Sequence, residues 1–280
     1  MASAIVRALA LLSAPGNAVR FSMRQRLGSA GMARLQNERK DALFAHLPAR
    51  EREQAWRREQ ELCDRYDLAR LHGMSSLLHY AENVALLDLL ERSAVPLAAP
   101  PDVPLRAIDV GSGPFPYATA MQRFLARAGG AGVALTGVEI DGNGRYRDGT
   151  PRAAHGRAHA ALAGQRVEYR VDDFTRMLLP TQDFVSMLFP FLTAYPLLRW
   201  GLPLRVLQPR RLLERAADRL RSGGVLLVVN QTEAEFVRLQ RLMNGLPLWL
   251  ERSSSWRTSL VPYAEQTEDR FGSWWRRVGG

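Results

Sequence analysis

The chain has 280 residues, 46% of them hydrophobic, and a formal net charge of +10. These values are those of a globular protein with one large domain, or one domain and an appendage. The single cysteine, Cys63, excludes an internal disulfide and a cysteine-based metal site, and a reducing compartment is its natural setting. No run approaches the roughly 18 apolar residues that a membrane-spanning helix needs.

Nearly all of the positive charge is arginine, because Lys40 is the only lysine. Acidic and basic residues alternate over most of the chain. We therefore attribute the arginine excess to a genome rich in G and C. Binding to nucleic acid or to an anionic surface is the alternative that such a charge leaves open.

The first 37 residues contain five arginines and no acid. Several apolar residues here lie at helical spacing: Ala4, Ile5, Ala8, Leu9 and Leu12. An organellar transit peptide or a weak secretory signal would also be basic and apolar, but Arg7 interrupts the apolar stretch. We expect an ordinary N-terminal helix in a bacterial, cytoplasmic protein.

Residues 1–95 are predicted to be all-helical. Ser29 is expected to cap a helix that runs through Arg34 to His46 and ends at Pro48. A charged helix is expected over residues 50–71, broken by Gly73, and a third helix is expected to begin at Ser75 or Ser76. Four prolines in residues 95–104 indicate a stiff linker. We therefore predict a helical region over 1–95 and a second domain over 105–280.

The second domain begins with a stretch whose pattern is typical of a ligand-binding loop. Residues 107–118 read as a short apolar strand ending in an acid, a loop with two glycines, and a helix start. Glycines let the backbone approach a ligand, and a helix start presents free N–H groups to it. A second strand over 133–141 also ends in acids, as in a fold that binds ribose there. Pro116 occupies the place of the third glycine of a dinucleotide-binding loop, which argues against NAD.

The remainder alternates as a parallel sheet with intervening helices should. Strands are predicted at 106–110, 133–140, 166–171, 183–188 and 224–230, with helices from about 116 to 128, from about 152, and over 209–220. Ser222, Gly223 and Gly224 are expected to form the turn into the fifth strand. Residues 246–254 and 270–278 are expected to form a closing antiparallel hairpin. The predicted fold class is α/β, a Rossmann-like sheet of seven mostly parallel strands beside an all-helical N-terminal region.

The first strand and its loop resemble motif I of class I S-adenosylmethionine-dependent methyltransferases, hydrophobic-Asp-x-Gly-x-Gly. The resemblance implies that the loop lies at the methionine end of the cofactor, and it consists of Asp109, Gly111, Ser112 and Gly113. It also implies that Glu139 binds the ribose hydroxyls, with Asp141 as the alternative. Asp173, with Asp172 as the alternative, would accept a hydrogen bond from the adenine amino group. Phe174 would lie beside the adenine ring.

Residues 183–191 resemble motif IV of the same family, but they lack the Asn-Pro-Pro-Tyr type of sequence that holds adenine or glutamine. Phe189 and Phe191 could instead pack on an apolar substrate. The proline-broken insert at 195–204 could be a lid, a partner surface, a local membrane contact or buried packing. The candidate substrate residues are Tyr80, Phe189, Phe191, Tyr195 and Trp200. No metal site is predicted, and His72 and His79 are interpreted as packed or surface histidines.

The expected function is S-adenosylmethionine-dependent methyl transfer to a small, largely apolar or aromatic molecule. An RNA or protein methyltransferase and a cofactor-binding protein without activity are alternatives. The Gly-Ser-Gly-Pro-Phe-Pro sequence from Gly111 is also similar to the Gly-Ser-Gly-Pro-Leu-Pro turn of nicotianamine synthases. Those enzymes transfer an aminobutanoyl group from the same cofactor. The sequence does not indicate an oligomeric state.

Overall fold

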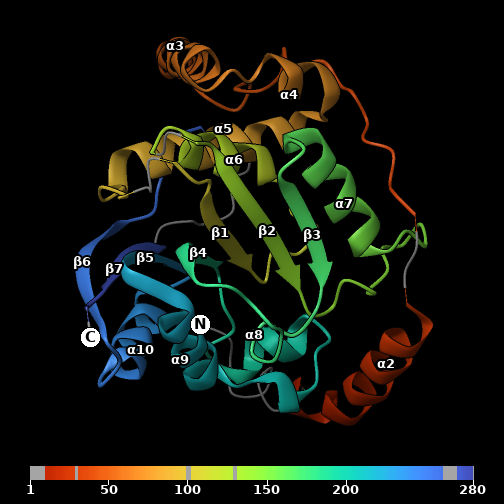
Figure 1. Cartoon of the computed structure of the whole chain (residues 1–280). Coiled ribbons are helices and arrows are strands. Elements are labelled where there is room, and N and C mark those ends of the chain that lie inside the picture. The colour runs from red at the N-terminus through yellow and green to blue at the C-terminus, as the bar shows by residue number, and fades with distance from the viewer. Residues whose placement is uncertain (1–9, 29–30, 99–101, 129–130, 261–269, 280) are drawn as a thin grey trace.

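The computed structural model describes residues 10–28, 31–98, 102–128, 131–260 and 270–279. Its centre is one seven-stranded sheet with the order β3-β2-β1-β4-β5-β7-β6 (Figure 1). The strands are β1 Leu105–Val110, β2 Val133–Glu139, β3 Val167–Val171, β4 Gln182–Leu188, β5 Leu220–Asn230, β6 Leu248–Ser255 and β7 Phe271–Arg277.

Strands β1 to β5 pair in parallel, and β7 runs antiparallel to both β5 and β6. The predicted mostly parallel sheet is therefore confirmed, and so is the closing hairpin. The central strands read as continuous apolar runs because both faces of the sheet are covered. In β5, residues 224–230 are all buried.

The helices cover both faces and both ends of the sheet. They are α2 Ala14–Leu27, α3 Ala49–Tyr66, α4 Ala69–Met74, α5 Leu77–Ser93, α6 Ala118–Ala126, α7 Arg152–Ala163, α8 Ala194–Arg199, α9 Pro209–Arg219 and α10 Glu233–Met243, with a 3-10 turn at Leu204–Val206. None of the described helices is both long and apolar enough to cross a bilayer.

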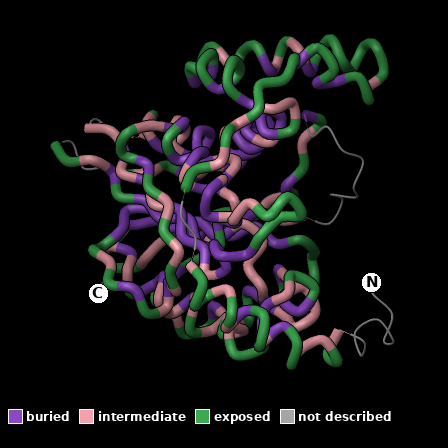
Figure 2. Tube along the Cα trace, turned by 90° about the vertical axis from the view of Figure 1, so that its right-hand side faces the viewer, coloured by how far each residue is buried: buried purple, intermediate pink, exposed green. Residues whose placement is uncertain are grey.

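Successive side chains of a strand point to opposite faces of the sheet, so neighbouring residues of the central strands enter two different hydrophobic cores. Val225 and Leu227 pack toward α5 and α6, whereas Leu226 and Val228 pack toward α9 and α10. Figure 2 shows buried positions concentrated along the sheet and the helices against it. Trp274 of β7 is fully buried within 6.4 Å of Phe124 and 6.2 Å of Phe184, measured between ring centroids. It joins the hairpin to the helical layer.

Two of the three helices predicted before the sheet need correction. Residues 32–40 are extended and 41–46 form turns, so the helix expected through Arg34 to His46 is absent. The reason is tertiary: the buried Lys40 ammonium donates to the carbonyl oxygens of Glu38 and Ser75, at 2.5 and 2.6 Å. The proposed cap Ser29, like residues 4–9 of the predicted N-terminal helix, lies outside the described residues.

The charged helix also ends earlier than expected. Asp67 adopts a left-handed conformation, with φ of 50°, and separates α3 from α4, while Gly73 lies inside α4. The third helix is confirmed, because the Ser76 hydroxyl caps α5 by accepting from the His79 N–H. The turn expected at residues 222–224 is also wrong, since β5 already begins at Leu220 and passes through it with a register shift. Helix α2 lies within the region predicted to be helical, although no bounds were predicted for it, and α10 was not predicted.

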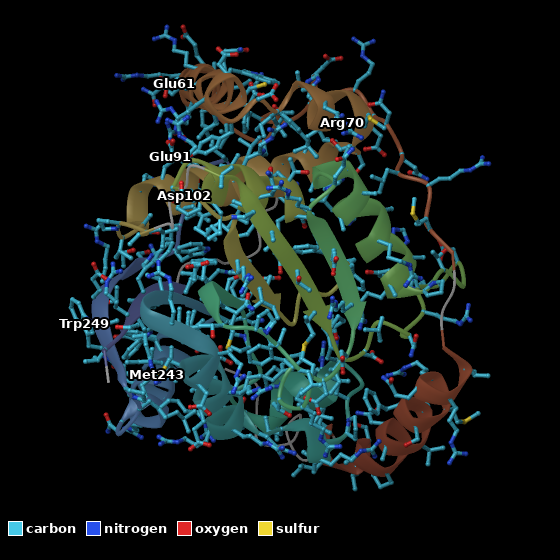
Figure 3. The ribbon with its side chains drawn as sticks, viewed as in Figure 1. Glu61, Arg70, Glu91, Asp102, Met243 and Trp249 are labelled. Atoms are coloured by element: carbon cyan, nitrogen blue, oxygen red, sulfur yellow. The ribbon has the colours of Figure 1, made fainter. Side chains whose placement is uncertain are left out.

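Charged side chains hold α3 against α5. Arg58 of α3 binds Glu61 on its own helix and reaches both Asp88 and Glu91 of α5, at 2.8 and 2.7 Å. Figure 3 shows Glu61 and Arg70 on the outer side of the α3–α4 layer, with Glu91 beneath it. Because α5 shares one hydrophobic core with α6 and the sheet, the helical region is joined to the second domain by packing.

Asn83 of α5 forms hydrogen bonds that connect this helical region to the loop after β1. Its buried amide donates to the carbonyl oxygens of His79 and Pro116, both at 2.8 Å, and accepts a hydrogen bond from the Ala120 N–H at 2.9 Å.

We expect Asn83→Ala to lower the free energy of unfolding by about 2 kcal/mol, because the Pro116 carbonyl and the Ala120 N–H lose their buried partner. Urea unfolding checks this, with exposed Asn244→Ala as the control. A loss within about 0.5 kcal/mol of the control would contradict it.

Candidate functional site

The loop between β1 and α6 is shaped by glycines and tied to β2. Gly111 and Gly113 have φ of 77° and 55°, and Phe115, with φ of 57°, shares this left-handed region. The N–H groups of Gly111 and Ser112 donate to the Val138 carbonyl, at 2.8 and 3.1 Å. A Cβ built on either glycine meets nothing within 4 Å, so backbone conformation rather than crowding requires glycine here. The loop therefore presents open backbone at the carboxyl edge of the sheet.

Asp109 fixes the start of this loop. Its fully buried carboxylate accepts from the Ser186 hydroxyl at 2.6 Å and from the Tyr117 hydroxyl at 2.9 Å. Burial raises the pKa of Asp109 to about 6 in spite of these two hydrogen bonds. The carboxylate thus joins β1, β4 and the start of α6.

Glu139 ends β2 beside the same loop and is only 5% exposed. Its carboxylate accepts from the Gly113 N–H at 2.9 Å and from the Asp141 N–H at 2.8 Å. Burial raises its pKa, opposed mainly by the positive charge of Arg152, whose nearest nitrogen is 4.0 Å away. Each carboxylate oxygen has two lone pairs, so both oxygens can accept one further hydrogen bond.

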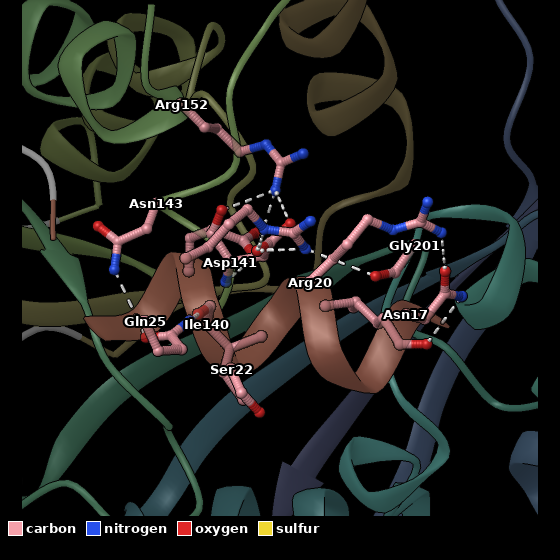
Figure 4. A network of polar contacts seen from close by, with 12 residues as sticks. Asn17, Arg20, Ser22, Gln25, Ile140, Asp141, Asn143, Arg152 and Gly201 are labelled. Atoms are coloured by element: carbon pink, nitrogen blue, oxygen red, sulfur yellow. Dashed lines mark hydrogen bonds and ion pairs between the residues drawn. The ribbon is translucent and has the colours of Figure 1, made fainter. Parts of the chain in front are cut away.

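Asp141, the alternative ribose acid, is an ion-pair centre (Figure 4). Its carboxylate lies 2.9 Å from Arg24 of α2 and 3.1 Å from Arg152 of α7. Gln25 of α2 donates to the adjacent Ile140 carbonyl at 2.7 Å. These contacts hold α2 across the carboxyl end of β2, and Figure 1 shows α2 and α8 at the end toward which β1, β2 and β3 point.

The acids after β3 are turned toward their own loop. The exposed Asp172 accepts from the Asp173 N–H at 2.7 Å, and Asp173 accepts from both the N–H and the hydroxyl of Thr175. Phe174 is 3% exposed and belongs to the core that contains Val138. The structure thus brings this segment to the end of β3, next to β2 in the sheet.

The candidate substrate residues fall into three places. Phe191 and Trp200 lie together, with ring centroids 6.2 Å apart, and the Arg152 guanidinium lies 5.0 Å over the Trp200 ring. Phe189 follows β4 with φ of 59° and lies under Arg270. Tyr80 is fully buried between helices and donates its hydroxyl to Glu59, so the structure does not bring it to the loop.

The insert at 195–204 contains no long helix, as expected. Within it, Tyr195 is partly buried, and Leu197 and Leu198 of α8 pack with Leu202 against Phe21 of α2. Asn17 of α2 donates to the Leu198 carbonyl at 3.0 Å. The insert is therefore packed against the first described helix of the chain.

Sequence reasoning assigned no role to a group of residues around Pro114. His159 of α7 contacts the Pro114 carbonyl oxygen through Nδ1 at 2.7 Å, and its ring centroid is 4.2 Å from that of His79. Burial lowers the pKa of His79 to about 4 and that of His159 to about 3, so both are neutral at pH 7. Tyr169 donates to the Gly113 carbonyl at 2.6 Å. The sequence interpreted His79 as a packed or surface histidine, and the structure buries it.

Glu82 is the acid of this group. Within the described part of the chain, its half-buried carboxylate has no hydrogen-bond partner, and burial raises its pKa to about 7. It precedes Asn83, whose side chain bonds to Pro116 after the glycine loop. A carboxylate with a pKa near neutrality can accept a proton at working pH.

Two buried polar groups at this edge are unpartnered within the described ranges. They are the Ser112 hydroxyl in the glycine loop and the side-chain amide of Asn230 at the end of β5. A buried polar group without a hydrogen bond is costly, so both are candidates to bind a polar ligand. Over the same residues, no cluster of three or more His, Cys, Asp or Glu side chains could hold a metal ion.

No protein-family model matches the chain, and no protein of curated function matches its sequence. Solved structures are similar in fold. TrmN from Thermus thermophilus has a TM-score of 0.47 and 16% identity over 70% of this chain, which spans about half (48%) of TrmN. The [4+2]-cyclase SpnF has a TM-score of 0.48 and 14% identity, covering 81% of this chain and 97% of its own. Geranyl diphosphate C-methyltransferase from Streptomyces coelicolor A3(2) has a TM-score of 0.48 and 12% identity, covering 73% and 85%.

These similarities concern the fold, and the fold itself is assigned from the strand order. The order β3-β2-β1-β4-β5-β7-β6 with β7 antiparallel is that of the Rossmann-like sheet of class I S-adenosylmethionine-dependent methyltransferases. The fold expected from the motif I resemblance is therefore confirmed.

The raised pKa of Glu82 predicts a pH dependence of stability. The folded pKa, about 7, lies above the ordinary 4.5, so the folded state holds the proton more tightly. The stabilisation is complete below the ordinary pKa and is lost as the pH rises through 7. Glu82→Gln should therefore gain stability over the wild type between about pH 5 and about pH 8.

Urea unfolding of both proteins across that pH range measures the difference between their free energies of unfolding. Asp109, His79 and His159 titrate in both proteins, so their contributions cancel from this difference. Exposed Glu51→Gln is the control, because Glu51 has no hydrogen bond or ion pair among the described residues. A Glu82→Gln difference that is flat with pH would mean that Glu82 titrates normally.

Proposed function

We propose that the protein is an S-adenosylmethionine-dependent methyltransferase. The observation that carries the proposal is the junction of the Gly111–Gly113 loop with Glu139. Open glycine backbone, an unpartnered Ser112 hydroxyl and a buried carboxylate meet there at the carboxyl edge of a methyltransferase-type sheet. In such sheets ligands bind outside the carboxyl ends of the strands, where the strand order reverses. Here the order reverses between β1 and β4.

In this proposal each part of the cofactor has a partner. Glu139 accepts from the two ribose hydroxyls through the lone pairs that its backbone hydrogen bonds leave free. Asp172 or Asp173 accepts from the adenine amino group, beside Phe174. Ser112 and the Gly111 and Gly113 backbone bind toward the methionine end, and Asp109 keeps that backbone in place.

When bound, the sulfonium of the cofactor supplies an electrophilic methyl group. The protein then has to hold a nucleophile in line with that methyl and to exclude water. Helix α2 and the 195–204 insert lie over this edge and serve to exclude water. Glu82 is the base that we propose for an acceptor that loses a proton on methylation, and its carboxylate would take that proton.

We propose a small, largely apolar or aromatic acceptor. Phe191 and Trp200 give it apolar surface, and the insert carries few charges apart from Arg199. The small-molecule partner, a bacterial source and a cytoplasmic location remain predictions from the sequence. Aminobutanoyl transfer, from the similarity of the Gly-Ser-Gly-Pro-Phe-Pro turn, remains the alternative chemistry of the same site.

The first test is cofactor affinity. Glu139→Gln keeps the shape of the side chain but loses its charge and an acceptor, so we expect S-adenosylmethionine to bind more weakly by about 1.5–3 kcal/mol. Ser112→Ala should bind it more weakly by about 1 kcal/mol without loss of stability, because its hydroxyl has no partner to lose. Titration calorimetry measures both, with exposed Glu168→Gln as the control. Unchanged affinity in a folded Glu139→Gln would remove Glu139 from the site, and tighter binding of NAD would reject the cofactor.

The second test is the by-product. Incubation of the enzyme with S-adenosylmethionine and candidate aromatic or apolar acceptors should release S-adenosylhomocysteine, detected by mass spectrometry. Methylthioadenosine would instead identify aminobutanoyl transfer, and it would reject methyl transfer while keeping the cofactor site. Glu82→Gln should slow turnover with little change in cofactor affinity, since it acts on the acceptor. An equal loss in both would contradict its role as the base.

A further inference from the structure

The outer face of α2 carries an apolar stripe. Val19, Met23 and Leu27 are 61%, 58% and 75% exposed. Their spacings of four residues place them on one side of the helix. The opposite side holds Phe21, which is 5% exposed and packs on the insert. The exposed stripe therefore does not contribute to the hydrophobic core that anchors the helix.

The charges around this stripe have one sign. Residues 10–28 contain three arginines and no acid, and residues 194–208 contain two arginines and no acid. Arg24 is directed inward to Asp141, whereas Arg20, Arg26, Arg199 and Arg205 are exposed. The exposed charges on this surface are therefore all positive.

Arg205 brings the insert into the same surface. Its guanidinium donates to the Ser22 hydroxyl at 3.1 Å and lies 5.3 Å over the Phe21 ring. A shallow hollow between α2 and the insert is lined by Val19, Met23, Arg26 and Arg205 together with Ala18 and Ser22. Apolar and cationic side chains thus meet on one continuous face, which we name the α2 face.

We propose that the α2 face docks on the surface of an anionic lipid bilayer. Helices that lie in the plane of a bilayer combine exposed apolar residues with arginine or lysine and bind anionic lipids through both. At 14 residues α2 is about 21 Å long, too short to span a bilayer. Its apolar side chains enter the acyl boundary while the arginines stay with the headgroups. A nucleic acid would be held by the arginines alone and would leave the three apolar side chains in water.

Docking in this way would place the bilayer next to the carboxyl edge of the sheet, because α2 is attached to that edge through Arg24 and Gln25. The proposal does not depend on the proposed transferase activity, because binding to lipid is measured without cofactor. Failure of one therefore leaves the other standing.

The experiment is co-sedimentation of the full chain with large unilamellar vesicles. Vesicles containing phosphatidylglycerol and phosphatidylcholine should bind the protein, and vesicles of phosphatidylcholine alone should bind it at least about tenfold more weakly. Binding should fall as salt is raised, because the headgroup attraction is screened.

Two sets of variants separate the parts of the face. Val19→Ser with Met23→Ser should weaken binding by at least about tenfold. Arg26→Gln with Arg205→Gln should weaken it by roughly 25-fold, about fivefold per arginine. Leu178→Ser, at a residue that is 94% exposed on the loop between β3 and β4, is the matched control and should bind as the wild type does. All the apolar positions are exposed, so circular dichroism should report an unchanged fold.

Equal binding to neutral and anionic vesicles, or none to either, would overturn the proposal. So would an apolar double variant that binds as tightly as the wild type. Binding to a single-stranded RNA that is lost in the arginine variant but retained in the apolar variant, without competition by vesicles, would identify the face as a nucleic-acid surface instead.

Discussion

The hydrogen bonds from the Gly113 and Asp141 N–H groups to the Glu139 carboxylate are the contacts on which the site depends. They fix a buried charge between the end of β2 and the loop after β1, one strand from the point where the strand order reverses. Burial of that charge is costly, and the hydrogen bonds together with Arg152 offset the cost. Glu139 is therefore held in place before any ligand arrives, which is what binding to a ribose diol requires.

Two further layers of helices lie on either side of this junction, outside the sheet itself. On one side α5 reaches the loop through Asn83, the residue after Glu82. On the other side α2 crosses the carboxyl edge through the ion pair between Arg24 and Asp141, and the insert packs against α2. A common sheet can serve many reactions, so under the proposed function these two layers select the acceptor.

The sequence predicted the sheet well, because its signals are local: apolar runs, glycine turns and strand-ending acids. Predictions from local signals failed where a distant contact decides, as when buried Lys40 holds residues 32–40 extended by bonding to Ser75. For the site, the adjacency of the loop and Glu139 was predicted from the motif I resemblance and from the acids that end the second strand. The burial of Tyr80 against Glu59 and the pairing of Asp141 with Arg24 depend on helices packed from far along the chain. No periodicity in the sequence reports such contacts.

The central claim is that the loop and Glu139 together bind the adenosine part of S-adenosylmethionine. A crystal structure of the full chain with S-adenosylhomocysteine tests it most directly. The account predicts both ribose hydroxyls within about 3 Å of the Glu139 carboxylate oxygens, and the homocysteine end along Gly111 to Gly113. A ligand bound with its ribose away from Glu139, or bound outside the carboxyl edge of β1 and β2, would contradict it.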